Sequence, residues 1–160
     1  AFLESMARAS GDIVIVLSPD GNSIPEKIPE LVERMKEGFD IVICSRYRDG
    51  AQSQDDDVVT AFGNWMFTRL LNLLFGLKIT DCLVMYKAYR REVIEQLNIS
   101  AEVVSWGTQI LARAGKRGLK IGEIGGDEPP RIGGVRKMHP LKNGISELSM
   151  MVSEFFRRKF

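Results

Sequence analysis

The sequence has little that would indicate a metal–thiolate site, a disulfide framework or a membrane span. Its 160 residues include two cysteines and one histidine, and Cys44 and Cys82 do not have the spacing of a zinc site. No apolar run reaches the roughly 18 residues that a spanning helix needs, and no signal peptide is recognisable. Cys44 closes an apolar strand pattern, where we expect a reduced, buried thiol, so the sequence predicts a reducing, cytoplasmic setting.

The chain also lacks the charge excess of a nucleic-acid-binding protein. Lys and Arg number 22 against 21 Asp and Glu, a formal net charge of +1, and we therefore predict no nucleic-acid partner. The charge is uneven, however. Residues 131–160 hold seven Lys or Arg against Glu147 and Glu154, which leaves a net charge of +5. An anionic ligand is therefore expected to meet the C-terminal end of the chain.

The sequence does contain alternating strand and helix patterns. Residues 12–17 and 40–45 are short, β-branched apolar runs typical of buried strands, and a helical apolar stripe lies between them. Ser23 and Glu26 form a capping-box pattern before this helix, and Gly38 follows its end. This order predicts a βαβ unit in an α/β sheet, with parallel strands and a right-handed crossover. The loops after both strands should then meet at one edge of the sheet.

Two later helices have conspicuous apolar faces. Residues 55–76 are apolar around most of a helical circumference, so this helix should pack on two sides or against an apolar partner. Its main stripe is Val58, Phe62, Met66, Leu70 and Leu73. Further strands are predicted at 85–89 and 119–124, helices at 90–97 and 101–114, a polar loop at 125–138 and an amphipathic helix from Pro140.

The chain ends in FFRRKF, which leaves two alternatives for the last helix. It is either a core helix with a basic, fraying end, or an interfacial helix. In the second case Phe155, Phe156 and Phe160 would lie among lipid headgroups, with the basic residues meeting anionic lipid. We divide the chain into a main domain portion, residues 1–139, and this amphipathic helix, residues 140–160.

The segment SPDGN after the first strand has two interpretations. Ser18-Pro19-Asp20-Gly21 suits a type I turn. Alternatively, Asp20 holds a divalent cation on a diphosphate, with Asn22 as a second oxygen ligand. Arg46 and Arg48 follow the second strand at the matching edge, as a solvated loop or as guanidinium groups for phosphate.

Other charged groups also have two interpretations each. Residues 55–57 are three aspartates before a helix, where they either cap it or form a metal cluster. Asp81 follows the long helix as a turn residue, or as a general base if it faces the cleft. The loop 129–140 is either a disordered basic segment or a ligand-contacting one. In the second case, Gly133 and Gly134 would allow a close backbone approach among basic side chains, namely Arg131, Arg136 and Lys137.

These segments together resemble glycosyltransferase family 2, closest to its polyprenyl-phosphate branch of dolichol-phosphate mannosyltransferase-like enzymes. The resemblance covers nearly the whole chain in the family's order. It rests on GDIVIVLSPDGNSIPEKIPELVERMKEGFDIVICSRY, GNWMFTRLLNLLFGLKITDC, YKAYRREVI, RAGKRGLKIGEI and RIGGVRK. It implies a partial GT-A, Rossmann-like mixed sheet flanked by helices. The family's first strand–helix–strand part, which binds the nucleotide base, has no counterpart here. Because residues 1–12 also resemble the tail of a helix, we expect the chain to start partway through a larger fold.

The resemblance implies a role for each candidate residue. Asp20 and Asn22 would hold Mg²⁺ or Mn²⁺ and, with Ser18, the donor diphosphate; Arg46 would face the acceptor's phosphate. Arg131, Arg136 and Lys137 would bind phosphates, and Asp81 would be the catalytic base. The family's Asp-x-Asp motif is reduced to Ser18-Pro19-Asp20, so metal dependence stays open. The acidic run at 55–57 replaces residues that are usually basic, which argues against assuming a lipid-phosphate acceptor.

The implied function is transfer of a sugar from a nucleotide-sugar donor to a polyprenyl-phosphate, a glycan or another hydroxyl acceptor. A non-catalytic member that binds a nucleotide, a glycan or a protein partner is the alternative. We expect a cytoplasmic location, with peripheral contact at the cytoplasmic face of a membrane through the last helix. A homo-oligomer is left open.

Overall fold

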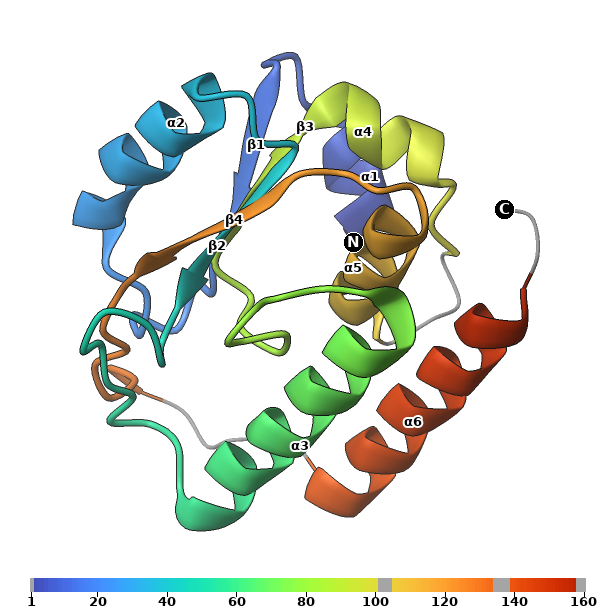
Figure 1. Cartoon of the computed structure of the whole chain (residues 1–160). Coiled ribbons are helices and arrows are strands. Elements are labelled where there is room, and N and C mark those ends of the chain that lie inside the picture. Colours follow the sequence, from blue (N-terminus) through green and yellow to red (C-terminus); the bar gives the residue numbers. More distant parts are fainter. Residues whose placement is uncertain (1, 101–104, 134–138, 158–160) are drawn as a thin grey trace.

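The computed structural model describes residues 2–100, 105–133 and 139–157, with helices on both sides of an open four-stranded sheet (Figure 1). In Figure 1, α2 lies on one side of the sheet and α1, α4 and α5 lie on the other. The helices are α1 (Phe2–Arg8), the short 3₁₀ turn η1 (Pro25–Lys27), α2 (Ile28–Lys36), α3 (Val58–Phe75), α4 (Arg91–Leu97), α5 (Trp106–Lys116) and α6 (Pro140–Phe156). The strands are β1 (Ile13–Val16), β2 (Ile41–Ser45), β3 (Lys87–Arg90) and β4 (Ile121–Gly125).

The sheet has the order β1-β3-β2-β4. β3 is antiparallel to both β1 and β2, which makes β1 and β2 parallel to each other, and β4 is parallel to β2. The predicted parallel orientation of the first two strands is therefore confirmed. However, these strands are not neighbours, because β3 lies between them and Tyr89 pairs with Val14 on one side and Ile41 on the other. The α/β class is confirmed, as a mixed sheet.

The start of the helix after β1 differs from the prediction. The Ser23–Glu26 capping box is wrong, because the cap of η1 is Ile24 and has no side-chain hydrogen bond. Ser23 instead accepts a hydrogen bond from the backbone of Ser18 at 3.4 Å, within the turn. Pro25 opens the 3₁₀ turn and a second proline lies in the first turn of α2. Proline lacks the N–H that a side-chain cap would satisfy.

Helix α3 buries a different face from the predicted one. Asp57 caps it by the reciprocal capping box with Thr60, as the capping alternative predicted. The predicted stripe, however, is largely exposed: Val58 is 86% and Leu73 is 80% exposed. The buried side chains are Asn64, Phe67, Thr68, Leu71 and Phe75, and the helix packs against α5 and α6. A helix that is apolar nearly all round gives no clear direction for its core face.

Helix α6 packs beside α3 and α5 (Figure 1). Glu154 accepts hydrogen bonds from Gln109 at 2.8 Å and Arg113 at 3.0 Å, all buried, and Met151 is fully buried. The opposite face of α6 is exposed and apolar at Leu141, Ile145, Leu148, Val152, Phe155 and Phe156. Phe160 and the basic residues Arg158 and Lys159 lie outside the described residues. Within the described ranges, no helix combines the length and apolarity needed to cross a membrane.

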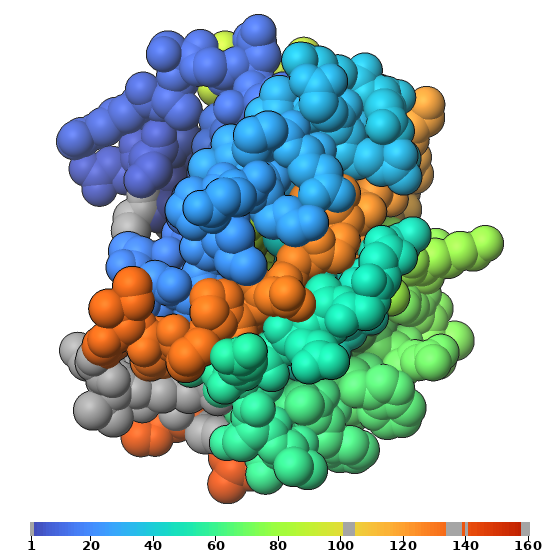
Figure 2. Space-filling view, turned by 90° about the vertical axis from the view of Figure 1, so that its left-hand side faces the viewer, coloured from blue at the N-terminus to red at the C-terminus, as the bar shows by residue number. Residues whose placement is uncertain are grey.

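The strand directions bring several loops to one edge of the sheet. β1, β2 and β4 end at this edge, and β3 begins there. The segment after β4 is fastened on both sides, since Ile132 N donates to Asp20 O at 3.0 Å and Gln54 N donates to Glu128 O at 2.8 Å. Figure 2 shows this segment (orange) between the turn after β1 (blue) and the loop after β2 (teal). The predicted meeting of the first two loops is confirmed, with a third loop joining them.

Candidate functional site

A cavity of about 270 Å³ opens at this edge, and we call it the polar pocket. Its polar and charged lining comes from the loops after β1, β2 and β4: Ser18, Asp20, Asn22, Ser23, Arg46, Asp55, Glu128 and Arg131. Residues 83–86, which precede β3, supply the rest of the wall. Five of the residues that the sequence indicated as ligand-binding thus share one cavity.

Asp20 has one paired and one unpaired carboxylate oxygen. Its Oδ2 lies 3.5 Å from Arg131 Nη1. Its Oδ1 is buried and has no hydrogen-bond partner among the described residues. The turn that holds it needs Gly21, which has a φ of +83° and would place a Cβ 2.4 Å from the Ile132 side chain. An unpaired buried carboxylate oxygen is costly, so Oδ1 is the atom of this pocket best suited to receive a cation.

Asn22 and Glu128 connect the turn to the loop after β4. The side-chain nitrogen of Asn22 donates to Glu128 Oε1 at 3.0 Å. The other oxygen of Glu128 accepts from Arg46 Nη1 at 3.1 Å and from the Ser53 hydroxyl. The sequence analysis missed Glu128, although it follows β4 at the same edge and the rule that found Asp20 and Arg46 would have found it.

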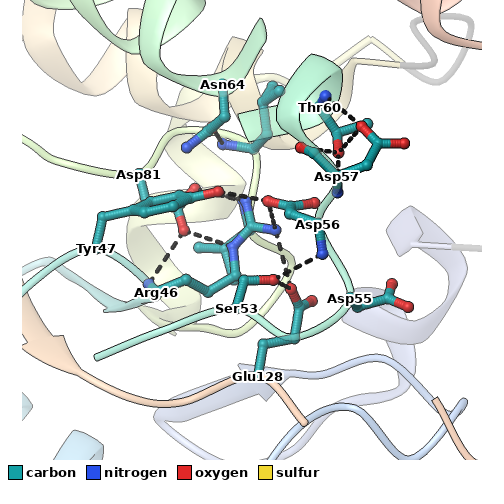
Figure 3. Close-up of polar contacts among 12 residues, drawn as sticks. Arg46, Tyr47, Ser53, Asp55, Asp56, Asp57, Thr60, Asn64, Asp81 and Glu128 are labelled. Atoms are coloured by element: carbon teal, nitrogen blue, oxygen red, sulfur yellow. Dashed lines mark hydrogen bonds and ion pairs between the residues drawn. The ribbon is translucent and has the colours of Figure 1, made fainter. Parts of the chain in front are cut away.

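Arg46 lies among three carboxylates (Figure 3). It donates to Asp81 Oδ2 at 2.7 Å and Oδ1 at 3.0 Å, and to Asp56 Oδ2 at 2.9 Å; Glu128 is the third. Burial acts to lower the pKa of Arg46, but attraction by Asp81, and then by Glu128 and Asp56, outweighs it and raises the pKa. The guanidinium is therefore held by the protein's own carboxylates.

Asp81 is 0% exposed. Besides its two bonds to the Arg46 side chain, it accepts from Val84 N at 3.2 Å. A general-base role was expected only if Asp81 faced the cleft, and this condition is not met. Beneath it, Lys87 donates to the carbonyl oxygens of Cys82 and Val84, and burial lowers the pKa of Lys87 to about 8.

The three aspartates before α3 have three different partners. Arg131 donates to Asp55 at 2.7 Å and 3.1 Å, Asp56 accepts from Arg46 and from the Tyr47 hydroxyl, and Asp57 caps the helix. Over the described ranges, no group of three His, Cys, Asp or Glu side chains could hold a metal ion. The metal-cluster alternative for residues 55–57 therefore has no support there.

The remaining candidates contribute less to the pocket. Arg48 pairs with Asp49 and with Glu123, each at 3.3 Å. Arg136 and Lys137 lie outside the described residues. Cys44 is free and buried, as expected, and Cys82 is free and buried too; burial raises the pKa of both thiols to about 12.

A second cavity, of about 220 Å³, lies between α3 and α6, and we call it the helix cavity. It shares Arg46 and Leu83 with the polar pocket, so the two lie on either side of these residues. Two of its lining residues, Asn64 and Glu147, each have a buried side-chain atom with no hydrogen-bond partner within the part of the chain that the structure describes. No pattern in the sequence indicated a binding role for either residue.

Comparison with known proteins identifies relatives. The chain is 32% identical over 97 residues to an undecaprenyl-phosphate 4-deoxy-4-formamido-L-arabinose transferase of Klebsiella pneumoniae (strain 342), which covers 61% of this chain and 28% of that protein. It is 29% identical over 161 residues to polyprenol monophosphomannose synthase of Mycolicibacterium smegmatis (strain ATCC 700084 / mc(2)155), which covers 92% of this chain and 56% of that protein. The chain thus spans between about a quarter and a half of the length of these relatives.

The fold is also that of a solved glycosyltransferase. The crystal structure of glucosyl-3-phosphoglycerate synthase from Mycobacterium tuberculosis, in complex with Mn²⁺, UDP-glucose and phosphoglyceric acid, matches with a TM-score of 0.66 and 22% identity. The match covers 99% of this chain and 54% of that chain, and it confirms the expected GT-A type of fold. The sequence profile of glycosyl transferase family 2 matches residues 1–97. The chain therefore belongs to glycosyl transferase family 2.

Proposed function

We propose that this chain forms part of the active site of a nucleotide-sugar-dependent glycosyltransferase, with the donor diphosphate in the polar pocket. The observation that carries the proposal is the unpaired Oδ1 of Asp20, buried beside Asn22 and two arginines at the carboxyl ends of the strands. Ligands of open α/β sheets bind at this edge. One relative is named as a sugar transferase and another as a phosphomannose synthase, and the solved neighbour is in complex with UDP-glucose.

A divalent cation fits this pocket. Asp20 Oδ1 is a carboxylate oxygen without a partner among the described residues. The amide nitrogen of Asn22 is engaged by Glu128, so its oxygen is the atom that would ligate the ion. Oxygen ligands of this kind suit Mg²⁺ or Mn²⁺, and the solved neighbour contains Mn²⁺ with UDP-glucose. Such an ion would neutralise charge that develops on the leaving diphosphate.

The basic residues divide into two roles in this proposal. Arg131 reaches Asp20 and Asp55 at the rim and is placed to contact a phosphate, and Arg136 and Lys137 would add charge there. Arg46 is a positioning residue, because its guanidinium joins the loop after β2 to the segment before β3 through Asp81 and to the loop after β4 through Glu128. We assign Asp81 to the anchoring of Arg46 rather than to proton abstraction.

The acceptor would be a hydroxyl or phosphate oxygen, and the relatives named for undecaprenyl phosphate and polyprenol support a lipid-linked one. A membrane surface fits the apolar residues that α3 and α6 expose side by side, including Trp65 and Phe156. Helices with such faces lie in the headgroup layer. In this proposal residues 1–139 belong to the catalytic domain and residues 140–160 contact the cytoplasmic face of a membrane.

Calorimetric titration with UDP-, GDP- and dTDP-sugars, with and without Mn²⁺, tests the donor site. It should be run on this chain and on a version extended upstream, each with an Asp20→Ala variant. We expect metal-dependent binding that Asp20→Ala abolishes, and unchanged binding by Glu95→Ala, a control at an exposed position of α4. Unchanged affinity in Asp20→Ala would remove Asp20 from the site. Absence of binding by both folded lengths would favour a non-catalytic binding protein.

A further inference from the structure

The helix cavity is the place where the structure leaves polar groups without partners. Asn64 is 2% exposed, and its Oδ1 accepts a hydrogen bond from Leu83 N at 3.2 Å. Asn64 lines the cavity, and its Nδ2 is buried without a partner in residues 2–100, 105–133 and 139–157. Figure 3 shows Asn64 next to the Arg46 cluster. The bond to Leu83 fixes which end of the amide faces a ligand.

Glu147 provides an acceptor in the same cavity, from α6. Its Oε2 is buried without a partner within the described ranges, while the carboxylate interacts with Ser105 and Thr108 behind it. Burial raises the pKa of Glu147. Buried polar atoms are nearly always hydrogen-bonded in folded proteins, so a donor and an acceptor left over in one cavity indicate a ligand that supplies both complements.

The charge of the cavity argues against an anionic ligand. Among the described residues that line it, Arg46 is the one cation, and its charge is already met by Asp56, Asp81 and Glu128. Asp56 and Glu147 lie in the wall itself. A phosphate placed here would face these carboxylates, with a large penalty in a partly desolvated space. Val59, Phe67 and Leu83 provide an apolar part of the wall.

We propose that the helix cavity binds an uncharged, hydroxyl-bearing acceptor with an apolar portion, whose hydroxyl groups accept from Asn64 Nδ2 and donate to Glu147 Oε2. This inference rests on the proposed function, since it names the class of acceptor that would meet the donor across Arg46. It separates this chain from the relative whose name specifies undecaprenyl phosphate. Asn64 and Glu147 are assigned to binding, and no proton transfer is attributed to them.

The test compares two soluble probes that share one apolar chain, n-octyl β-D-glucopyranoside and n-octyl phosphate. Both are titrated below their micelle concentrations, without any donor. We expect the glucoside to bind at least tenfold more tightly than the phosphate. Glu147→Gln should weaken glucoside binding and strengthen phosphate binding, because it removes a negative charge but keeps the shape. Asn64→Ala should weaken glucoside binding about tenfold, the effect of losing about 1.4 kcal/mol.

Controls separate this result from other causes. Glu95→Gln removes an exposed carboxylate on α4 and should leave both affinities unchanged. Adsorption to the exposed apolar faces of α3 and α6 would be the same in all variants, and that outcome would overturn the proposal. Tighter binding of octyl phosphate than of the glucoside would also overturn it. If Asn64→Ala fails to fold, Glu147→Gln still tests the proposal, because its glucoside binding should weaken while its phosphate binding strengthens. Donor binding is measured separately, so either proposal can fail alone.

Discussion

The two cavities on either side of Arg46 differ in how their polar groups are satisfied. In the polar pocket, most charges are paired within the protein: Arg131 with Asp55, and Arg46 with Glu128. Among its described lining residues, the Oδ1 of Asp20 is the one buried side-chain atom without a partner. In the helix cavity, by contrast, a donor on Asn64 and an acceptor on Glu147 both lack partners there.

This difference separates groups that hold the fold from groups that await a ligand. Buried ion pairs with several hydrogen bonds fix loops in place, and their loss is costly because an uncompensated charge remains. An unpaired buried atom gives the fold nothing until a ligand completes it. In our proposals Arg46, although it looks like a phosphate ligand in the sequence, belongs to the first group, and Asp20, Asn64 and Glu147 belong to the second.

The largest effect is expected for Arg46→Met. In the wild type the guanidinium lies 2.7 to 3.1 Å from carboxylate oxygens of Asp56, Asp81 and Glu128. The substitution leaves these three carboxylates close together without a cation. We expect the free energy of unfolding to fall by about 3–5 kcal/mol, measured by urea denaturation. Adding Asp81→Asn should restore part of it, because one uncompensated charge is removed. A loss below about 1 kcal/mol would place Arg46 among the ligand-binding groups instead.

The sequence located the polar pocket because strand ends can be read from short apolar runs. Ser18, Asp20, Asn22 and Arg46 each follow such a run, and parallel strands bring their ends to one edge. The partners of Arg46 could not be predicted in the same way. Its contacts with Asp56, Asp81 and Glu128 join residues 10, 35 and 82 positions apart. Such contacts depend on how loops cross in three dimensions.

The helix cavity could not be predicted from the sequence, for a second reason. It requires the buried face of α3, and the sequence favoured the opposite face because large apolar residues occur all round this helix. Asn64 and Thr68, two polar residues, lie on the buried side, where their hydrogen bonds to Leu83 and Cys82 hold the loop before β3. The position of β3 between β1 and β2 was missed because neighbours in sequence are usually neighbours in the sheet.

A pH-dependent effect of somewhat smaller size is expected for Lys87→Met. Burial lowers the pKa of Lys87 from 10.5 to about 8 in the folded protein. Between these values the unfolded chain binds a proton that the folded chain does not, so the destabilisation caused by this buried amine is progressively relieved as pH rises from about 8 to 10.5. The stability of the wild type relative to Lys87→Met should therefore increase by up to about 3 kcal/mol over that range.

Urea denaturation of both proteins at about pH 7.5 and pH 10 measures this difference. The Lys36→Met variant, at an exposed position of α2, provides the control and should show no such change. A difference between wild type and Lys87→Met that is constant with pH would mean that Lys87 keeps its ordinary pKa.

If the exposed apolar faces of α3 and α6 contact a membrane, removing aromatic residues from them should weaken membrane binding. Phe62 and Trp65 are exposed and stack with their ring centroids 5.7 Å apart. Replacing both by Ser should reduce co-sedimentation with phosphatidylcholine–phosphatidylglycerol vesicles about tenfold or more, from the apolar area no longer buried. Their exposure should keep stability nearly unchanged. Leu17→Ser, away from α3 and α6, is the control, and equal losses in both proteins would argue against this surface.

The smallest effect, and the sharpest test of the polar pocket, is expected for Arg131→Gln. Arg131 Nη1 lies 3.5 Å from Asp20 Oδ2, so its charge opposes a cation on Asp20. Removing this charge relieves a repulsion that water partly screens, and Mn²⁺ alone should bind roughly fivefold more tightly. UDP in the presence of Mn²⁺ should bind more weakly, because a phosphate contact is lost.

The control is Arg48→Gln, which should change neither affinity, because the guanidinium of Arg48 pairs with Asp49 and Glu123 instead. Since the two expected changes have opposite signs, a general loss of structure cannot produce them. Weaker binding of Mn²⁺ in Arg131→Gln would show that the cation does not bind at Asp20.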